Sequence, residues 1–355
     1  MNASQSKKNI VFACVLVCVL SCGKAAPEMK PDTRDSVSDT GTGRDTDNMP
    51  TENEGSDTQP STERASYDTS TNSDDTSSNS DDTSTVDPNC VHPEVIKSCS
   101  NGWCRIPAGC FTAGSPTDEM AHGAYSEVQN QITFTRAFEI QQYEVTQGQW
   151  EGAGFYNPSS FGPNGNGQCT STDCPLENIN WYEAIAFANR MSELHDPPLP
   201  ACYSLDGCTG EVGKGMVCEA VTVNAETIYK CTGYRLPTMY ESEYATRAGT
   251  TTAFYAGDIT RYTLLAECNV DANLDRIAWY CQNSQDKTHT VGQKEPNSWG
   301  LYDVAGNVSE WVDTQFNGRN SGTEPVTDPT GPSDVPDRHA LRGGAWTTPA
   351  MTSII

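Results

Sequence analysis

The sequence predicts a loop-rich α+β fold that is held together by disulfides. Aromatic residues and glycines recur from Cys90 onward, two segments have helical periodicity, and twelve cysteines lie between Cys90 and Cys281. The candidate strands are short and do not alternate with helices, which excludes a regular βαβ arrangement. The part of the chain from Cys90 onward is long enough for one sizeable domain with its own core.

Two helices are predicted, in the segments 178–194 and 235–249. Each begins with a capping box, in which a cap side chain and a glutamate three residues later satisfy free N–H groups of the first turn. The pairs are Asn180 with Glu183 and Thr238 with Glu241. Gly249 is predicted to end the second helix. Short strands are predicted in the segments 110–115, 134–145 and 340–346.

Residues 1–22 are predicted to be the signal peptide of a bacterial lipoprotein. Lys7 and Lys8 precede an apolar run that is short for a bilayer span and ends in the letters VLSC. This ending resembles a lipobox, so Cys22 would be lipidated and become the new N-terminus; an ordinary secretory signal is the alternative. Gly23 after the cysteine favours the outer membrane. We therefore expect an exported lipoprotein at the outer membrane, on the cell surface or on the periplasmic side.

Residues 23–89 are predicted to be a disordered acidic tether. They consist largely of Ser, Thr, Asp and Asn, and such a segment buries too little apolar surface to fold. The whole chain has a formal net charge of -25. Nucleic acid is excluded as a partner because its phosphates require basic patches. The expected partners are the membrane, through the lipid anchor, and another protein.

Twelve cysteines remain after Cys14, Cys18 and Cys22 of the signal segment. An even number in an exported chain predicts disulfides rather than free thiols. Zinc is disfavoured because no CxxC pair occurs and the histidines have no ligand spacing. The sequence leaves the connectivity open, but short spacings favour Cys169 with Cys174, Cys202 with Cys231, Cys208 with Cys218, and Cys268 with Cys281. The remaining four, Cys90, Cys99, Cys104 and Cys110, would pair among themselves.

Six motifs follow one another in a fixed order along the second part of the chain. They are RIPAGCFTAGS (105–115), FEIQQYEVTQGQW (138–150), CPLENINWYEAIAFANRMS (174–192), GYRLPTMYESEYATRAG (233–249), NSWGLYDVAGNVSEW (297–311) and LRGGAW (341–346). In this order they resemble the formylglycine-generating enzyme family, also called the sulfatase-modifying-factor domain. The resemblance implies a fold with little regular secondary structure, related to C-type lectin-like folds, and we assign residues 90–355 to this domain.

The resemblance also implies a calcium site in the segment GLYDVAGNVSEW (300–311). Its ligands would be the carboxylates of Asp303 and Glu310 and the carbonyl oxygens of Gly306 and Val308. Calcium takes six to eight such hard oxygen ligands. The alternative is a tight turn in which the two carboxylates bind only backbone N–H groups.

A second calcium site is implied more weakly, at Asn269 and the carbonyl oxygen of Val270. Glu144, in the segment YEVTQ, is a fixed landmark of the family and is expected to support an ion or a helix end. Arg235 is expected to bind core carboxylates or carbonyl oxygens rather than a substrate.

No catalytic residue is assigned from the sequence. The founding enzymes of the family oxidise a sulfatase cysteine to formylglycine with copper and dioxygen, and they bind copper(I) through two cysteines after the RGG strand. Thiolates suit this soft ion, but no cysteine follows Cys281. Either the C-terminal end of the domain is truncated in this chain, or the protein is a degenerate relative.

Two functions are therefore expected. The first is a non-catalytic, calcium-stabilised interaction module on an exported, lipid-anchored protein. The second is a formylglycine-generating-type oxidoreductase, with copper as cofactor only if the missing C-terminal segment exists. No nucleophile elbow, phosphate-binding glycine loop or HExxH motif provides another catalytic set.

Overall fold

The computed structural model describes residues 90–120, 122, 127–260, 267–315, 324–330 and 339–350, and the backbone pairing of residues 10–11 and 14–15. These residues belong to a unit made of residues 1–20 and 83–355. Residues 21–82 form a second unit, none of which is described. Cys22 and the predicted tether thus lie outside the described residues. In the described part of the chain, no helix is long and apolar enough to cross a membrane.

The described strands form four small sheets. The largest has the order β10 (Tyr234–Arg235), β1 (Ile10–Val11), β7 (Phe138–Gln141), β4 (Trp103–Ile106) and β3 (Cys99–Ser100). A second contains β13 (His339–Arg342), β11 (Glu310–Gln315) and β2 (Cys14–Val15). A third contains β12 (Val326–Thr327), β6 (Asn130–Phe134) and β5 (Gly109–Ala113). The hairpin of β8 (Tyr203–Asp206) and β9 (Ala220–Val223) is the fourth. β1 runs parallel to both its neighbours, and β12 runs parallel to β6.

Both predicted helices are present and begin as expected. α2 (Trp181–Leu194) and α3 (Met239–Arg247) each start with the complete capping box. Gly249 follows the end of α3 as predicted: the helix ends at Arg247, Ala248 is its C-cap at φ 47°, and Gly249 comes next at φ 87°. The predicted strand 134–145 is two strands, since the chain leaves β6 at Phe134 and enters β7 at Phe138.

Two six-residue α-helices were not predicted, α1 (Gln147–Gly152) and α4 (Ala272–Ile277). A single 3-10 turn, η1 (Ile228–Lys230), precedes β10 among the described elements. These helices are too short to reveal a 3.6-residue period in the sequence. Both helices nevertheless begin with a side-chain cap. Thr146 and Gln149 form a capping box at the start of α1, and Asp271 accepts two backbone N–H bonds at the start of α4.

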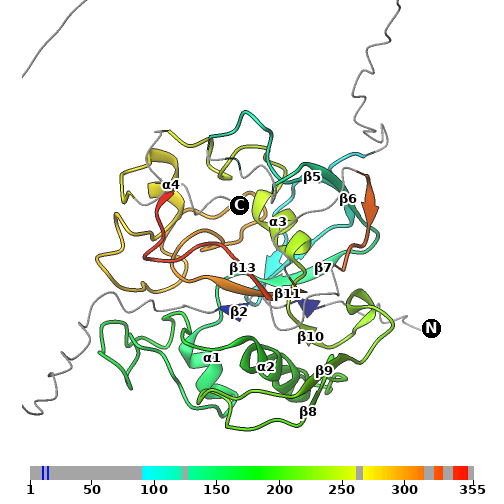
Figure 1. Cartoon of the computed structure of the whole chain (residues 1–355), viewed down its shortest axis with the longest axis vertical. Helices are drawn as coiled ribbons and strands as arrows, with labels where there is room; N and C mark the ends of the chain where they lie inside the picture. Colours follow the sequence, from blue (N-terminus) through cyan, green and yellow to red (C-terminus); the bar gives the residue numbers. More distant parts are fainter. Residues whose placement is uncertain are drawn as a thin grey trace, which may run out of the picture. The chain divides into compact units, whose positions relative to one another are not determined.

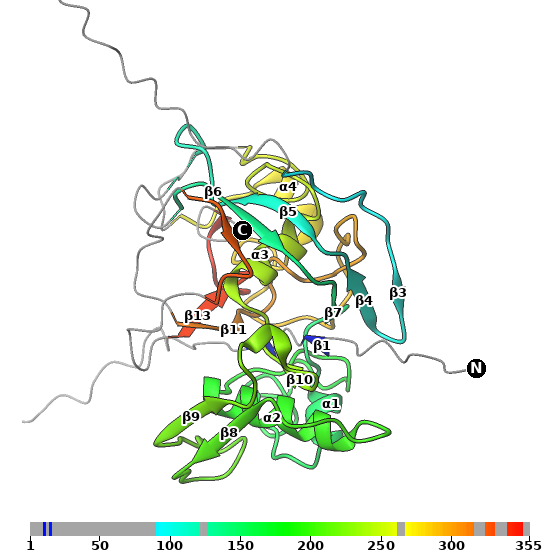
Figure 2. The ribbon, with the colours of Figure 1, turned by 90° about the vertical axis from the view of Figure 1, so that its right-hand side faces the viewer.

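The elements lie in layers on either side of the central strands. Figures 1 and 2 show α1, α2 and the β8–β9 hairpin on one side, and α3, α4, β5 and β6 on the other. The main core continues through both layers. Trp150 and Phe187 stack at 5.2 Å in the first, while Tyr244 and Trp299 meet edge-on at 5.0 Å in the second.

Six disulfides join the twelve cysteines of this domain. They include all four pairs that short spacing favoured, Cys169–Cys174, Cys202–Cys231, Cys208–Cys218 and Cys268–Cys281. The first four cysteines pair as Cys90–Cys110 and Cys99–Cys104. Cross-links of this kind restrict the unfolded chain and compensate for the small amount of regular secondary structure.

Candidate functional site

The segment that the resemblance assigned to calcium is a tight buried loop between α4 and β11. Asp303, Gly306 and Asn307 all have positive φ, at 55°, 77° and 56°. A side chain at Gly306 would place its Cβ 2.4 Å from the carbonyl oxygen of Trp279. Glycine is therefore required at this position by both its backbone conformation and the close approach of another segment.

Two distant segments hold this loop in place. Glu144 accepts hydrogen bonds from Asn307 Nδ2 at 2.6 Å and from the N–H of Val308 at 3.0 Å. The amide of Asn307 also bonds both the N–H and the carbonyl oxygen of His289, at 2.9 and 3.0 Å. Asn307 is fully buried and makes three side-chain hydrogen bonds, so the turn has a defined geometry.

The segment after β13 closes the loop from the other side. The N–H of Gly306 donates to the carbonyl oxygen of Gly343 at 2.7 Å. The N–H of Trp346 donates to the carbonyl oxygen of Asn307 at 2.9 Å. The motif LRGGAW is thus physically joined to the motif of the loop. These two hydrogen bonds place the two motifs side by side in the fold.

The two predicted carboxylate ligands are both buried, and neither has a cationic partner among the described residues. Burial raises the pKa of Asp303 to about 6, although Asp303 Oδ2 accepts a bond from the N–H of Gly292 at 2.6 Å. Burial and the charge of Asp303 together raise the pKa of Glu310 to about 8. The pKa of Glu144 is raised well above its usual value, first by burial and then by these two neighbours. The loop therefore brings acidic side chains into a buried environment, and burial favours their neutral forms unless positive charge is nearby.

Several oxygen atoms of the loop are not otherwise engaged. Asp303 Oδ1 is buried and has no hydrogen-bond partner in the described part of the chain. No described residue donates a hydrogen bond to the carbonyl oxygens of Gly306 or Val308. A buried oxygen without a donor is costly, and a cation would compensate for it. The donor set thus fits a hard divalent cation such as calcium.

The carboxylates do not form a three-acid cluster. Among residues 90–350 that the structure describes, no three His, Cys, Asp or Glu side chains come together as ligands of one ion. Both oxygens of Glu144 are occupied by Asn307 and Val308. Glu144 therefore supports the loop, and a cation there would rely on Asp303, Glu310 and backbone carbonyl oxygens.

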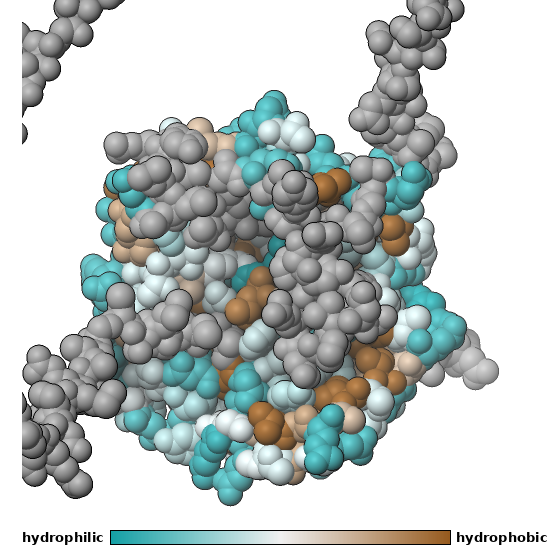
Figure 3. Space-filling view, viewed as in Figure 1, coloured by the Kyte–Doolittle hydropathy of each residue, from teal (hydrophilic) through white to brown (hydrophobic). Residues whose placement is uncertain are grey.

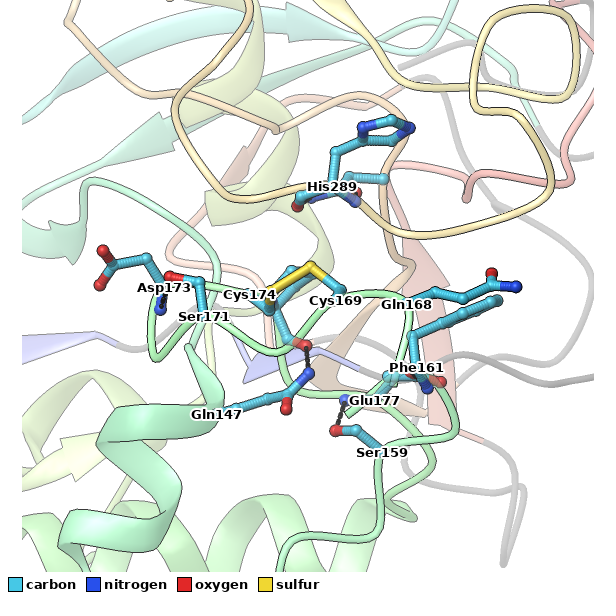
Figure 4. Close-up of a disulfide and its surroundings, with 12 residues drawn as sticks. Gln147, Ser159, Phe161, Gln168, Cys169, Ser171, Asp173, Cys174, Glu177 and His289 are labelled. Atoms are coloured by element: carbon cyan, nitrogen blue, oxygen red, sulfur yellow. Dashed lines mark hydrogen bonds between the residues drawn. A yellow bond between two sulfur atoms is a disulfide. The ribbon is translucent and has the colours of Figure 1, made fainter. Parts of the chain in front are cut away.

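A disulfide lies beside the segment that carries His289. Figure 4 shows the imidazole of His289 on one side of Cys169–Cys174, with Gln147 and Ser159 on the other. The N–H of Val291 donates to the carbonyl oxygen of Asp173 at 3.1 Å, which ties the two segments together. The His289 ring also stacks on Trp279 at 3.8 Å. The bonds of His289 to Asn307 could not be inferred from the sequence, because no local pattern links the two residues.

The weaker calcium prediction, at Asn269 and Val270, falls on a more exposed segment. Asn269 Nδ2 donates to Glu267 Oε2 at 3.0 Å, and Val270 is 53% exposed. The following residue, Asp271, uses Oδ1 to cap α4. The structure does not bring Asn269 together with the Asp303 loop through any hydrogen bond, and this second site remains a prediction.

Arg235 has the structural role that was expected of it. Its guanidinium forms two hydrogen bonds of 2.7 Å with the carboxylate of Glu241, and both side chains are about 1% exposed. It also donates to the carbonyl oxygen of Leu236 and lies over the ring of Tyr229. The pair joins β10 to the first turn of α3, far inside the core.

A pocket of about 520 Å³ opens beside the largest sheet. Trp103 and Arg105 of β4, Glu139 of β7 and Tyr234 of β10 contribute to its wall, together with His195. Trp103 and His195 both contact the ring of Tyr234, at 5.5 and 5.8 Å between centroids. This pocket could not be inferred from the sequence, because its residues come from four separate segments.

The chain is similar in sequence and in fold to several known proteins. A model described as the Sulfatase-modifying factor enzyme 1-like domain matches residues 93–354. The chain is 30% identical over 232 residues to Chaperone protein LppX of Paenibacillus barcinonensis, covering 58% of this chain and 75% of that protein. It is 34% identical over 128 residues to a Formylglycine-generating enzyme of Streptomyces coelicolor, covering 36% of this chain and 40% of that enzyme. The solved structure of Treponema denticola variable protein 1 is similar, with TM-score 0.53 and 30% identity over 71% of this chain and 86% of that one.

Proposed function

The chain belongs to the sulfatase-modifying factor enzyme 1-like family, and from this premise we propose that its domain is a non-catalytic module that binds another protein. The proposal includes export and lipid attachment at Cys22, an acidic tether over residues 23–89, and calcium in the Asp303 loop. The relative LppX, which is named a chaperone protein, supports a role in protein binding.

The state of the cysteines is the observation that carries this proposal. Every cysteine in the described part of the domain is joined in a disulfide, so this part offers no thiolate for copper(I). Copper(I) sites of this family depend on a reduced cysteine pair, and soft sulfur ligands are needed to hold that ion. The oxidised domain is thus suited to rigidity rather than to copper chemistry.

Calcium is proposed as a structural ion. The unpartnered Oδ1 of Asp303 and the raised pKa of Glu310 support this proposal, because a cation would compensate both. Bound calcium would hold residues 303–310 in their turn, and backbone hydrogen bonds already join this turn to the segment after β13. It would stabilise the domain without taking part in a reaction.

A direct assay separates the two functions. The purified chain, loaded with copper(I), is incubated in air with a sulfatase-type cysteine peptide, and formylglycine is followed by mass spectrometry. We expect no conversion, whereas the Streptomyces coelicolor enzyme converts the peptide under the same conditions. Conversion that is lost on removing copper would overturn the proposal and favour the oxidoreductase.

The proposed anchor has its own test. Cells that express the full chain are labelled with a fatty-acid analogue, and membrane and soluble fractions are compared with those of Cys22→Ala. We expect label and membrane association in the parent protein and neither in the variant. An unlabelled, soluble parent protein would indicate an ordinary secretory signal. Separation of inner and outer membranes then tests the outer-membrane location, which Gly23 favours.

A further inference from the structure

The central strands β7 and β10 do not pair with each other. Instead, Ile10–Val11 (β1) lies between them and runs parallel to both. Ile10 is in register with Tyr234 on one side and Glu139 on the other, and Val11 with Arg235 and Ile140. Figure 2 shows β1 in this position between β7 and β10.

The spacing of a sheet explains why this position matters. Neighbouring strands lie about 4.8 Å apart, so β7 and β10 are held roughly two spacings, about 9.6 Å, from each other. At that distance they cannot bond directly, and without a strand between them their facing N–H and C=O groups lack partners. We call this place, lined by β7 and β10, the strand slot.

Two further residues of the N-terminal segment pair at a second strand edge. Cys14–Val15 (β2) pairs antiparallel with β11, on the side opposite β13. One N-terminal segment thus adds a strand to two different sheets, and it is the segment predicted to be a signal peptide. If residues 1–22 are removed on export, both edges become available in the processed protein.

We propose that in the processed protein an extended apolar segment of another chain adds as a strand in this slot. This proposal rests on the proposed protein-binding function and assigns it a site. Addition of a strand satisfies the backbone groups of β7 and β10, so main-chain hydrogen bonds supply much of the affinity. The chain's own apolar segment, seated between these strands in parallel register, indicates which peptide chemistry fits.

The two faces of the slot differ and would select different side chains. Glu139 and Tyr234 both line the 520 Å³ pocket, so a peptide residue in register with them lies on the pocket face. Ile140 and Arg235 are buried in the interior, with exposed fractions of 4% and 1%. The residue in register with these two must therefore be apolar, whereas the pocket face tolerates polar groups.

The surface near β9 and β10 carries exposed apolar residues, which is compatible with an apolar partner. On the face shown in Figure 3, apolar atoms gather near the region where Figure 1 places β10 and β9. Leu194, at the end of α2, and Val223, on β9, are among the exposed apolar side chains of this layer. A peptide leaving the slot on this side would continue over apolar surface.

The test uses a fluorescent peptide that copies residues 7–17 with Cys14 replaced by serine. Its binding is measured by anisotropy with the chain beginning at Cys22 and with the chain that retains residues 1–22. We expect saturable binding to the processed chain and binding at least tenfold weaker when the slot is already filled. Equal binding to both forms would overturn the proposal, as would no binding to either form.

Modified peptides distinguish strand addition from non-specific binding to apolar surface. Methylating the backbone nitrogen at the position of Ile10 or Val11 should weaken binding at least tenfold, because one bond to β7 or β10 is lost. Aspartate at the Val11 position should have a similar effect, and aspartate at the Ile10 position a clearly smaller one. If the methylated peptides bind as well as the parent peptide, the slot does not accept a strand.

Hydrogen exchange of the backbone amides locates the bound peptide. The peptide should slow exchange at residues 138–141 and 234–235 and leave the β8–β9 hairpin unchanged. Protection confined to any other part of the domain would contradict the assigned site. The outcome is independent of the copper assay, because conversion of a sulfatase-type peptide would defeat the proposed function without moving these exchange rates.

Discussion

Glu144 Oε2 accepts a hydrogen bond from Asn307 Nδ2 at 2.6 Å, although 163 positions separate the two residues in the sequence. The other oxygen of Glu144 accepts from the N–H of Val308. The buried carboxylate of Glu144, in the segment before α1, thus fixes the positions of the Asn307 side chain and the Val308 backbone in the proposed calcium loop. The loop is shaped by a distant partner as much as by its own glycine.

The first prediction concerns Asn307. Asn307→Gly tolerates the positive φ but removes all three side-chain hydrogen bonds, leaving Glu144 Oε2 and two backbone groups of His289 without partners. We expect a loss of about 3 kcal/mol in the free energy of unfolding, measured with urea. Asn224→Gly is the control, because exposed Asn224 also makes two side-chain bonds, to Ser204 and Ala201. A similar small effect of both substitutions would contradict the assigned role of Asn307.

The second prediction concerns calcium. With calcium at about a hundredfold above its dissociation constant, stability should rise by about 2.7 kcal/mol, or roughly 5–10 °C in melting temperature, relative to chelator. Glu310→Gln should abolish this difference and be no less stable than the parent protein in chelator at pH 7, because the pKa of about 8 keeps most of the Glu310 carboxyl neutral and glutamine has nearly the same shape. Glu295→Gln, at an exposed ion pair with Arg276, should keep the response. If the melting temperature is the same in calcium and in chelator, the loop is a turn that does not bind calcium.

The third prediction is a pH dependence that arises from Glu177. Burial raises the pKa of Glu177 from 4.5 to about 7, and its Oε2 has no hydrogen-bond partner in the described part of the chain. Between these two values the unfolded chain releases the proton while the folded protein keeps it, so stability falls as pH rises. The shift corresponds to about 3 kcal/mol. Glu177→Gln should remove this part of the fall between pH 4.5 and pH 8, as measured by urea unfolding at each pH. Parallel curves for the two proteins would show that Glu177 does not titrate in this range.

The fourth prediction contrasts two ion pairs. Arg235→Met leaves the buried carboxylate of Glu241 without its partner and should cost about 3–5 kcal/mol. Arg190→Met breaks an exposed pair with Glu193 and should cost less than about 1 kcal/mol. Both substitutions keep a long apolar side chain, and each removes one ion pair and one bond to a backbone carbonyl oxygen, of Leu236 or of Ala153, so burial is the main difference between them. Equal losses, measured by chemical denaturation, would show that burial does not decide the strength of these pairs.

Much of the local structure could be predicted because its causes lie within a few residues. The capping boxes at Asn180 and Thr238 involve side chains only three positions apart, and both are present. Disulfides between near neighbours, such as Cys169 and Cys174, were favoured for the same reason. The helix α1 carried a capping box at Thr146 as well, but six residues were too few for its periodicity to be recognised.

The sequence by itself determined the family, the loop-rich α+β class, the beginnings of α2 and α3, and the acidic loop around Gly306. Each of these depends on local chemistry or on the order of motifs along the chain. Only the tertiary structure decided that Glu144 binds Asn307, that the LRGGAW segment closes the loop, and that β7 and β10 leave room for one strand. These contacts join segments far apart in the chain, and packing of the whole domain selects them.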